Sequence, residues 1–264
     1  MQEINNIPYA GLCNRMRSIA SAIKLGEDIG CSVIVHWNNT SDCRCNFSDL
    51  FKPINVPSAI VVDNNRLLYK IPSKYNFWIP RLLQYLKFSC IIYNFNKNTD
   101  GNLIPRLKGS RVLLVSCHSM YNHFYLNRIF VPQDSIMNQI DILTTNFSAN
   151  TYGLHLRGTD HSISKNFSTI DKFERKIDAL IQEDASVKFY LATDEELKKE
   201  YLINKYGNRI LYKNSVLKRN SPEGMKDALI DMFCLSKTKK IFGSKGSSYS
   251  EIAAEIGCIE LEII

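Results

Sequence analysis

Residues 239–261, KKIFGSKGSSYSEIAAEIGCIEL, indicate the fold class of the chain most clearly. The apolar residues of this stretch predict a buried strand at Lys240–Gly243, then a glycine- and serine-rich turn, a helix over Ser247–Ile256 and a last strand near Cys258–Leu261. A strand that leads through a helix to another strand is the building unit of a parallel sheet. The end of the chain is therefore predicted to be α/β.

The same alternation extends back to about residue 149. Apolar periodicity predicts strands over 152–156, 187–192 and 209–212, and helices over 169–183, 195–206 and 222–236. Strict alternation indicates a doubly wound parallel sheet, in which ligands bind beyond the carboxyl ends of the strands. We therefore expect the chemistry in the loops that follow Leu156, Ala192 and Gly243.

The first half of the chain is also predicted to be α/β, but its middle has no clear pattern. The predicted elements are a helix from about Asn14 to Ile29, strands at Ser32–Trp37, Ala59–Val62 and Arg111–Ser116, and a helix from Gln133 to about Leu143. We place the boundary near residues 146–150. This gives an N-terminal domain of residues 1–148 and a C-terminal domain of residues 149–264.

The composition is that of an ordinary folded protein. The 264 residues are 45% hydrophobic and 22% charged, which excludes a disordered or collagen-like chain. Eight cysteines are present, but no pair of CxxC units supplies the ligands of a zinc site. The first residues, MQEINNIPYAGLC, do not form a secretory signal, and no apolar run is long enough to span a membrane. We therefore expect a cytoplasmic protein with free thiols.

The net charge of +7 is concentrated in one part of the chain. Residues 64–111 contain nine basic residues and a single acid, Asp100, interleaved with eight aromatic residues. A basic, aromatic surface attracts nucleic acid, anionic lipid or a phosphate-bearing substrate. The alternative is a solvated face over ordinary core aromatics.

Two glycine-containing turns precede predicted helices and suit an anionic ligand, because the amides at a helix start are free to bind one. Gly11–Arg15 adds the side-chain donors of Asn14 and Arg15, although a capped structural helix would give the same pattern. Gly243–Ser250 adds Lys245 and several hydroxyls. The second turn has neither the spacing of a P-loop nor that of a dinucleotide-binding turn.

Two further polar segments follow predicted strands. In His155–His161, Arg157 could donate two hydrogen bonds to a phosphate, and Asp160 or His161 could accept a proton. A salt-bridged turn is the alternative there. In Ala192–Glu196 the acids suit the start of the next helix, and Thr193 or Asp194 could cap it.

Several common catalytic motifs are absent from the sequence. There is no DxD pair for a divalent cation, no HExxH and no GxSxG. Basic side chains and helix ends must then neutralise a phosphate ligand. The residues alone thus indicate a metal-independent α/β protein that binds a phosphate or a nucleotide.

In their order and spacing, these segments resemble the motifs of the fucosyltransferase superfamily, which includes bacterial nodulation, core alpha-1,6- and protein O-fucosyltransferases. The matching segments are the glycine turn Gly11–Arg15, the His-x-Arg and following acid at His155, Arg157 and Asp160, Ala192–Asp194, Leu229–Asp231 and the pair Ser247–Ser248. The C-terminal half is covered almost continuously. Residues 51–148 have no assigned motif.

The resemblance implies a GT-B-like fold of two Rossmann-like domains facing a cleft, the N-terminal one reduced because the chain is short. The C-terminal domain would hold the nucleotide sugar, with Arg157 on the diphosphate, His155 and Asp231 at the guanine end, and Ser247 and Ser248 at phosphate. Asp194 and Lys245 are added to these donor-binding candidates. Asn14 and Arg15 would approach the reacting centre from the N-terminal domain.

The resemblance also implies an inverting transfer in which an acceptor hydroxyl attacks the anomeric carbon and the nucleotide leaves. Arg157, Asp160 and Asn14 are the candidate catalytic residues, with Asp160 as the base. No cofactor and no metal are expected. One departure stands out: core-type members have two consecutive arginines in the His-x-Arg motif, whereas Gly158 follows Arg157 here. Lys245 or Arg15 would replace the second contact, or the donor differs.

The sequence thus predicts a fucosyltransferase-like glycosyltransferase of surface polysaccharide synthesis, such as capsule or O-antigen, with GDP-fucose as the favoured donor. Its acceptor would be a glycan or a lipid-linked glycan, and residues 64–111 would touch an anionic inner membrane peripherally. Two alternatives stay open: another GDP-sugar, UDP-sugar or phosphorylated pentose as donor, and a nucleotide- or glycan-binding subunit without turnover. Nucleic acid is not an expected partner, because only the charge and the aromatic block support it.

Overall fold

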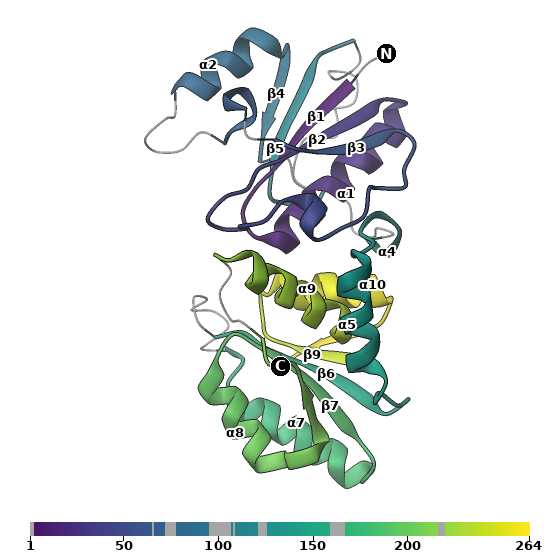
Figure 1. Ribbon diagram of the computed structural model, residues 1–264. Helices are drawn as coiled ribbons and strands as arrows, with labels where there is room; N and C mark the ends of the chain where they lie inside the picture. The colour runs from purple at the N-terminus through teal and green to yellow at the C-terminus, as the bar shows by residue number, and fades with distance from the viewer. Residues whose placement is uncertain are drawn as a thin grey trace. The chain divides into compact units, whose positions relative to one another are not determined.

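The computed structural model describes residues 3–64, 66–71, 78–94, 107, 109–120, 126–158, 167–215 and 220–264. The chain divides into two compact units, Met1–Gln133 with Arg219–Met225 and Asp134–Lys218 with Lys226–Ile264. Each unit has its own parallel sheet with flanking helices (Figure 1). The division after Gln133 falls earlier than the boundary expected from the sequence, because the helix over Asp134–Thr144 groups with the second unit.

The first unit contains a five-stranded parallel sheet of order β3-β2-β1-β5-β4. Its strands are β1 Glu3–Pro8, β2 Ser32–Trp37, β3 Ala59–Asp63, β4 Cys90–Tyr93 and β5 Val112–Ser116. Its helices are α1 Leu12–Ile29, α2 Trp78–Lys87 and α4 Leu126–Ile129, with short 3-10 helices η1 Phe47–Asp49 and η2 Leu67–Tyr69.

Helix α1 shows how the sequence sets this unit. Its apolar stripe, including Met16, Ile19 and Ile23, is buried. The helix ends at Gly30, whose φ of 70° is the left-handed conformation that a glycine adopts without strain. The N–H of the next residue, Cys31, then bonds the carbonyl of Gly26 at 2.8 Å and turns the chain into β2.

The second unit contains a five-stranded parallel sheet of order β10-β9-β6-β7-β8. Its strands are β6 Thr151–Leu156, β7 Lys188–Thr193, β8 Ile210–Tyr212, β9 Lys240–Gly243 and β10 Glu260–Ile263. Its helices are α5 Asp134–Thr144, α7 Ile170–Glu183, α8 Glu196–Tyr206, α9 Pro222–Ser236 and α10 Ser248–Gly257, with the 3-10 helix η3 Gly207–Arg209. The first turn of α9, up to Met225, groups with the first unit.

Helices cover both faces of this second sheet, α7 and α8 on one face and α9 and α10 on the other (Figure 1). Buried side chains from α7, α8 and the strands, such as Phe173, Leu202 and Phe242, pack into one apolar core. Strand order reverses between β6 and β9, where successive connections depart in opposite directions. Ligands of doubly wound sheets bind beyond the carboxyl ends of the strands at such a reversal.

These observations confirm the α/β class and the two Rossmann-like sheets predicted from the sequence. Both described sheets have five strands, so strand number gives no sign of the reduction that the chain length predicted for the N-terminal domain. The sequence-based prediction missed β1, α2, β4 and the short helix α4, all in the first unit. In the second unit each predicted strand and helix is present, with ends that differ by one or two residues.

Candidate donor site

Hydrogen bonds of one serine, Ser244, connect the carboxyl ends of β6 and β9. The backbone N–H of Arg157 donates a hydrogen bond to Oγ of Ser244 at 2.9 Å. Ser244 in turn donates from its backbone N–H and from its hydroxyl to the carbonyl of His155, each at 3.1 Å. Because Ser244 is fully buried, it fixes the backbone from which the Arg157 side chain leaves the sheet.

Asp194, which directly follows β7, orients the next stretch of this edge. Its Oδ1 accepts a hydrogen bond from the backbone N–H of Gly158 at 2.9 Å, and its Oδ2 lies 3.5 Å from Nε of Arg157. The Arg157 and Asp194 side chains are 18% and 19% exposed, so they are held in place but still reach solvent. A guanidinium held in this way suits the binding of a phosphate.

Gly158 stands against a carboxylate. A Cβ atom at this position would lie 1.5 Å from Oε1 of Glu195, so a larger residue fits only if Glu195 moves. The other oxygen of Glu195, Oε2, pairs with Nζ of Lys198 at 2.7 Å. Where the resemblance predicts a second arginine, this chain therefore has a glycine with a carboxylate packed over it.

The start of α10 lies after β9, on the loop that contains Ser244. Ser247 is the N-cap residue, is 6% exposed and makes no side-chain capping bond, and Ser248 is the first helical residue. Gly246 has a φ of 72°, which lets the loop turn into the helix. The amides and dipole of a helix start favour an anionic group, and the phosphate role of both serines stays a prediction.

Lys245 is exposed at the same loop. Its backbone N–H donates to Oγ of Ser168 at 2.9 Å, and its Nζ lies 4.0 Å from the ring centroid of Phe167. Nζ of Lys172 lies at the same distance from that ring. Two ammonium groups, one from this loop and one from α7, therefore lie close to one aromatic ring.

His155 is held inside the second unit. It is 5% exposed, and its ring stacks on Tyr249 of α10 with the centroids 4.7 Å apart. The Tyr249 hydroxyl donates to the carbonyl of Ala228 at 2.5 Å, which joins the stack to α9. The structure therefore gives His155 a packing role, and its place at the guanine end stays a prediction.

Asp231 on α9 has both carboxylate oxygens bound by hydroxyls. Tyr190 donates to Oδ1 at 2.6 Å, and Ser215 donates to Oδ2 at 2.9 Å. Burial raises the pKa of Asp231 to about 6, although these hydrogen bonds and the charge of Lys213 act in the opposite direction. Only 8% of Asp231 is exposed, and its guanine contact stays a prediction.

Arg15, which the sequence predicts to bind the donor, is enclosed by the first unit, and its donor contact stays a prediction. Its guanidinium is completely buried and lies 4.7 Å above the ring of Trp37. Nε donates to the carbonyl of Ala10 at 2.8 Å, Nη2 donates to Oγ1 of Thr40 at 2.6 Å, and Nη1 donates to the carbonyl of Asn38. All three nitrogens thus bind the protein itself.

The other predicted catalytic residues are less constrained. Asn14 lies in the first turn of α1 and is partly exposed, so its catalytic role stays a prediction. Asp160 and His161 lie outside the described residues. In the described part of the chain, no group of three His, Cys, Asp or Glu side chains is arranged to hold a metal ion. The metal independence of the reaction stays a prediction.

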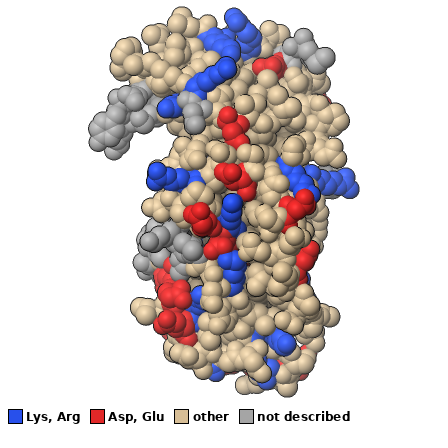
Figure 2. Space-filling view, viewed as in Figure 1, with Lys and Arg blue, Asp and Glu red and all other residues tan. Residues whose placement is uncertain are grey.

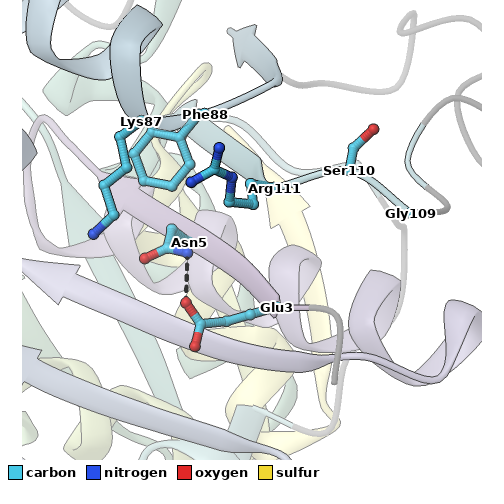
Figure 3. A pocket seen from close by; sticks show the side chains of 7 residues that line it. All are labelled: Glu3, Asn5, Lys87, Phe88, Gly109, Ser110 and Arg111. Carbon is cyan, nitrogen blue, oxygen red and sulfur yellow. Dashed lines mark hydrogen bonds between the residues drawn. The ribbon is translucent and has the colours of Figure 1, made fainter.

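A pocket of about 500 Å³ lies elsewhere, at the amino ends of β1 and β5 in the first unit (Figure 3). Lys87, Phe88 and Arg111 contribute to its lining, together with Glu3, Asn5, Gly109 and Ser110. It contains none of the predicted site residues. It also lies at the edge opposite to the one where α/β sheets bind their ligands, so it is not the candidate donor site.

The sequence prediction missed three residues of the donor edge: Ser244, Tyr249 and Glu195. Ser244 had a usable signal, because it directly follows a predicted strand. Tyr249 lay inside a quoted motif, but nothing in the spacing indicated a stack on His155. Glu195 contacts Gly158 across two loops, which sequence spacing does not reveal.

Comparison with known proteins places this arrangement among glycosyltransferase folds. No protein-family model matches the chain, and no curated protein matches it significantly. Among solved structures, NodZ alpha-1,6-fucosyltransferase soaked with GDP-fucose is similar, with a TM-score of 0.63 and 16% identity over 97% of this chain and 92% of that chain. The chain has the fold of a fucosyltransferase.

Two other structures share this fucosyltransferase fold. A mutant of Arabidopsis thaliana FUT1 in complex with GDP has a TM-score of 0.62 and 13% identity, over 99% of this chain and 70% of that chain. POFUT1 in complex with GDP has a TM-score of 0.60 and 10% identity, over 99% of this chain and 98% of that chain. At such identities the likeness establishes the fold, and the activity has to be argued from the site.

Proposed function

We propose that this chain is an inverting, metal-independent glycosyltransferase, fucosyltransferase-like, that transfers a sugar from a nucleotide sugar to a hydroxyl group. GDP-fucose is the favoured donor, and a glycan or lipid-linked glycan of surface polysaccharide synthesis is the acceptor. The donor would bind at the carboxyl edge of the second sheet. The N-terminal domain would supply the acceptor side.

The observation that carries this proposal is the placement of Arg157 at the point where strand order reverses in the second sheet. Ser244 and Asp194 orient it, and the start of α10 lies on the neighbouring loop. A fixed guanidinium and a helix start are the two groups that best stabilise a diphosphate without a metal. Solved structures with the same fold contain GDP or GDP-fucose.

In the proposed reaction, the acceptor hydroxyl attacks the anomeric carbon as the bond to the nucleoside diphosphate breaks. Arg157 stabilises the negative charge that develops on the leaving phosphate, while Ser247, Ser248 and Lys245 hold the phosphates. The hydroxyl proton passes to a base, for which Asp160 is the candidate. Charge stabilisation prepared in advance is the main source of the rate increase.

Gly158 and Glu195 favour a second candidate, in which the same fold uses another donor. A carboxylate over Gly158 puts negative charge beside the diphosphate-binding edge, where a second arginine would have put positive charge. A donor with a different nucleotide or phosphate group is then the alternative. A subunit that binds nucleotide without turnover is the remaining alternative.

The test is a transfer assay with purified full-length protein and a panel of GDP- and UDP-sugars, with a chelator present, measuring nucleoside diphosphate release. We expect release from GDP-fucose, increased by acceptor glycans, and a product of inverted anomeric configuration by NMR. Release from another donor alone would favour the second candidate. Binding of nucleotide without any release would contradict the enzyme proposal.

A further inference from the structure

Helix α2 turns its apolar side chains outward. Trp78, Leu82, Tyr85 and Leu86 are 67%, 51%, 57% and 72% exposed. They are spaced at i, i+4, i+7 and i+8, which places all four on one face of the helix. The helix therefore presents a continuous apolar face to solvent.

The opposite face of α2 packs against the first unit through a buried polar residue, Gln84. Gln84 is completely buried, donates from Nε2 to the carbonyls of Leu68 at 3.0 Å and Lys70 at 3.2 Å, and accepts a hydrogen bond from the Tyr93 hydroxyl at 2.7 Å. Helices at the surface of soluble proteins normally show the reverse polarity, with apolar residues inward. Because the three hydrogen bonds of Gln84 fix this face of α2 against the first unit, the helix cannot rotate about its axis to bury its leucines.

Positive charge lies beside this apolar face. Arg81 lies on the same helix, with its guanidinium 5.8 Å from the ring centroid of Tyr85. Lys87 ends the helix, and its Nζ donates to the Tyr69 hydroxyl at 2.8 Å, on the side that packs against the unit. Lys87 and Arg111 also line the neighbouring pocket (Figure 3). Figure 2 shows uncharged surface over α2, at the upper left of the view, bordered by the blue atoms of Lys and Arg. Residues 64–111 contain nine basic residues against one acid.

Size and charge both argue against a second copy of this chain as the partner. A stable dimer buries roughly 800 Å² on each partner. One face of a ten-residue helix, which is only about 15 Å long, offers much less area than that. A symmetric contact would also bring the two sets of basic residues together. A partner that is large and apolar and carries negative charge fits both the small area of this face and the basic residues beside it.

We propose that α2 is an interfacial helix that binds the surface of an anionic lipid bilayer. Trp78, Leu82, Tyr85 and Leu86 enter the boundary between headgroups and acyl chains, and Arg81 remains level with the lipid phosphates. Tryptophan and tyrosine favour this boundary, and basic residues favour an anionic leaflet. The proposal concerns a surface of the first unit and stands independently of the transferase activity.

Vesicle flotation of the full chain tests it, with phosphatidylcholine vesicles compared with vesicles that also contain phosphatidylglycerol. We expect binding to the anionic vesicles that weakens as salt rises. Leu82→Glu together with Leu86→Glu should lower partitioning by at least about tenfold, because burial of each leucine contributes about that factor. Leu197→Glu is the matched control: Leu197 is a leucine of α8 in the second unit, is 82% exposed, and should not affect binding when replaced.

Tryptophan fluorescence gives a second readout. The chain has two tryptophans, and Trp37 is buried at 1% exposure, so a change on vesicle addition reports on Trp78. We expect a blue shift of the emission with anionic vesicles and quenching by brominated lipids. Trp78→Phe should remove both signals and leave most of the flotation.

Three results would overturn the proposal. The first is no flotation with anionic vesicles, and the second is flotation that the double glutamate variant leaves unchanged. The third is self-association in sedimentation that the double variant abolishes, since the face would then bind protein. The double variant changes only exposed side chains, and its circular dichroism and melting temperature should match those of the wild type.

Discussion

The two units place two arginines, each in a sequence motif typical of phosphate binding, in opposite environments. Arg15 follows a glycine turn in the first unit and Arg157 follows a strand in the second, and both were predicted to touch a donor. The structure buries Arg15 completely among backbone carbonyls, whereas Arg157 stays 18% exposed beside Asp194. A sequence motif therefore locates a side chain along the chain but does not show whether its hydrogen-bond donors face inward or outward.

The largest expected effect is on activity at Arg157. Arg157→Ala should lower kcat/KM for transfer by about 10²–10³-fold, the usual cost of losing one prepared charge contact in the transition state. Steady-state kinetics with the active donor measures this. Arg175→Ala, which removes an exposed arginine of α7 in the same unit, is the control and should retain wild-type rates. Equal losses in the two variants would contradict the assigned role.

Arg15 should behave in the opposite way. Arg15→Ala leaves the carbonyls of Ala10 and Asn38 without their donor and opens a void under Trp37, so we expect a loss of about 3 kcal/mol or more in unfolding free energy. Urea denaturation measures it, and Arg157→Ala should cost less than about 1 kcal/mol in the same experiment. A stable Arg15→Ala protein that has lost donor binding would support the role expected from the sequence.

Asp231 should make the stability of the second unit depend on pH. Burial raises its pKa to about 6, above the ordinary value of 3.8, so the folded state holds this proton more tightly than the unfolded chain. Stability should therefore decrease as pH rises from 3.8 to about 6, and Asp231→Asn should remove that part of the slope. Urea midpoints across this window measure it, with exposed Asp171→Asn as the control. Identical slopes in wild type and Asp231→Asn would contradict the assignment.

The smallest expected effect concerns Glu195. Glu195→Gln removes negative charge from the surface over Gly158 and should tighten nucleoside diphosphate binding by about three- to tenfold, because the charge lies near a partly solvated edge. Calorimetry measures the affinity. Glu196→Gln changes the next residue, whose 52% exposed carboxylate pairs with Lys199, and should have no effect. Weaker binding in Glu195→Gln would show that the carboxylate contacts the ligand favourably.

The sequence predicted the second unit well because its strands are apolar and its helices have clear stripes. The first unit was harder for physical reasons. Strand β1 lies at the centre of its sheet, yet its sequence, EINNIP, contains two buried asparagines. Oδ1 of Asn5 lies 2.8 Å from Nε2 of His36, and Nδ2 of Asn6 donates to Oγ of Ser18 at 3.2 Å. Polar contacts made far along the chain thus stabilise a strand that composition does not indicate.

The candidate site was predictable only in part, for a related reason. Arg157, Asp194 and Ser247 follow strands or begin a helix, and periodicity locates such positions. The contact of Glu195 with Gly158 and the burial of Arg15 depend on loops and side chains from distant segments. Helix α2 was missed because its polarity is reversed, with Gln84 inside and leucines outside.

We propose that the second unit binds a nucleoside diphosphate through Arg157. The most direct measurement is thermal unfolding of the full chain with GDP, UDP, ADP or CMP in the presence of EDTA, because a ligand that binds only the folded state raises its stability. We expect stabilisation by GDP that is lost in Arg157→Ala and kept in Arg175→Ala. The absence of stabilisation by any of the four nucleotides, or GDP stabilisation that survives in Arg157→Ala, would contradict it.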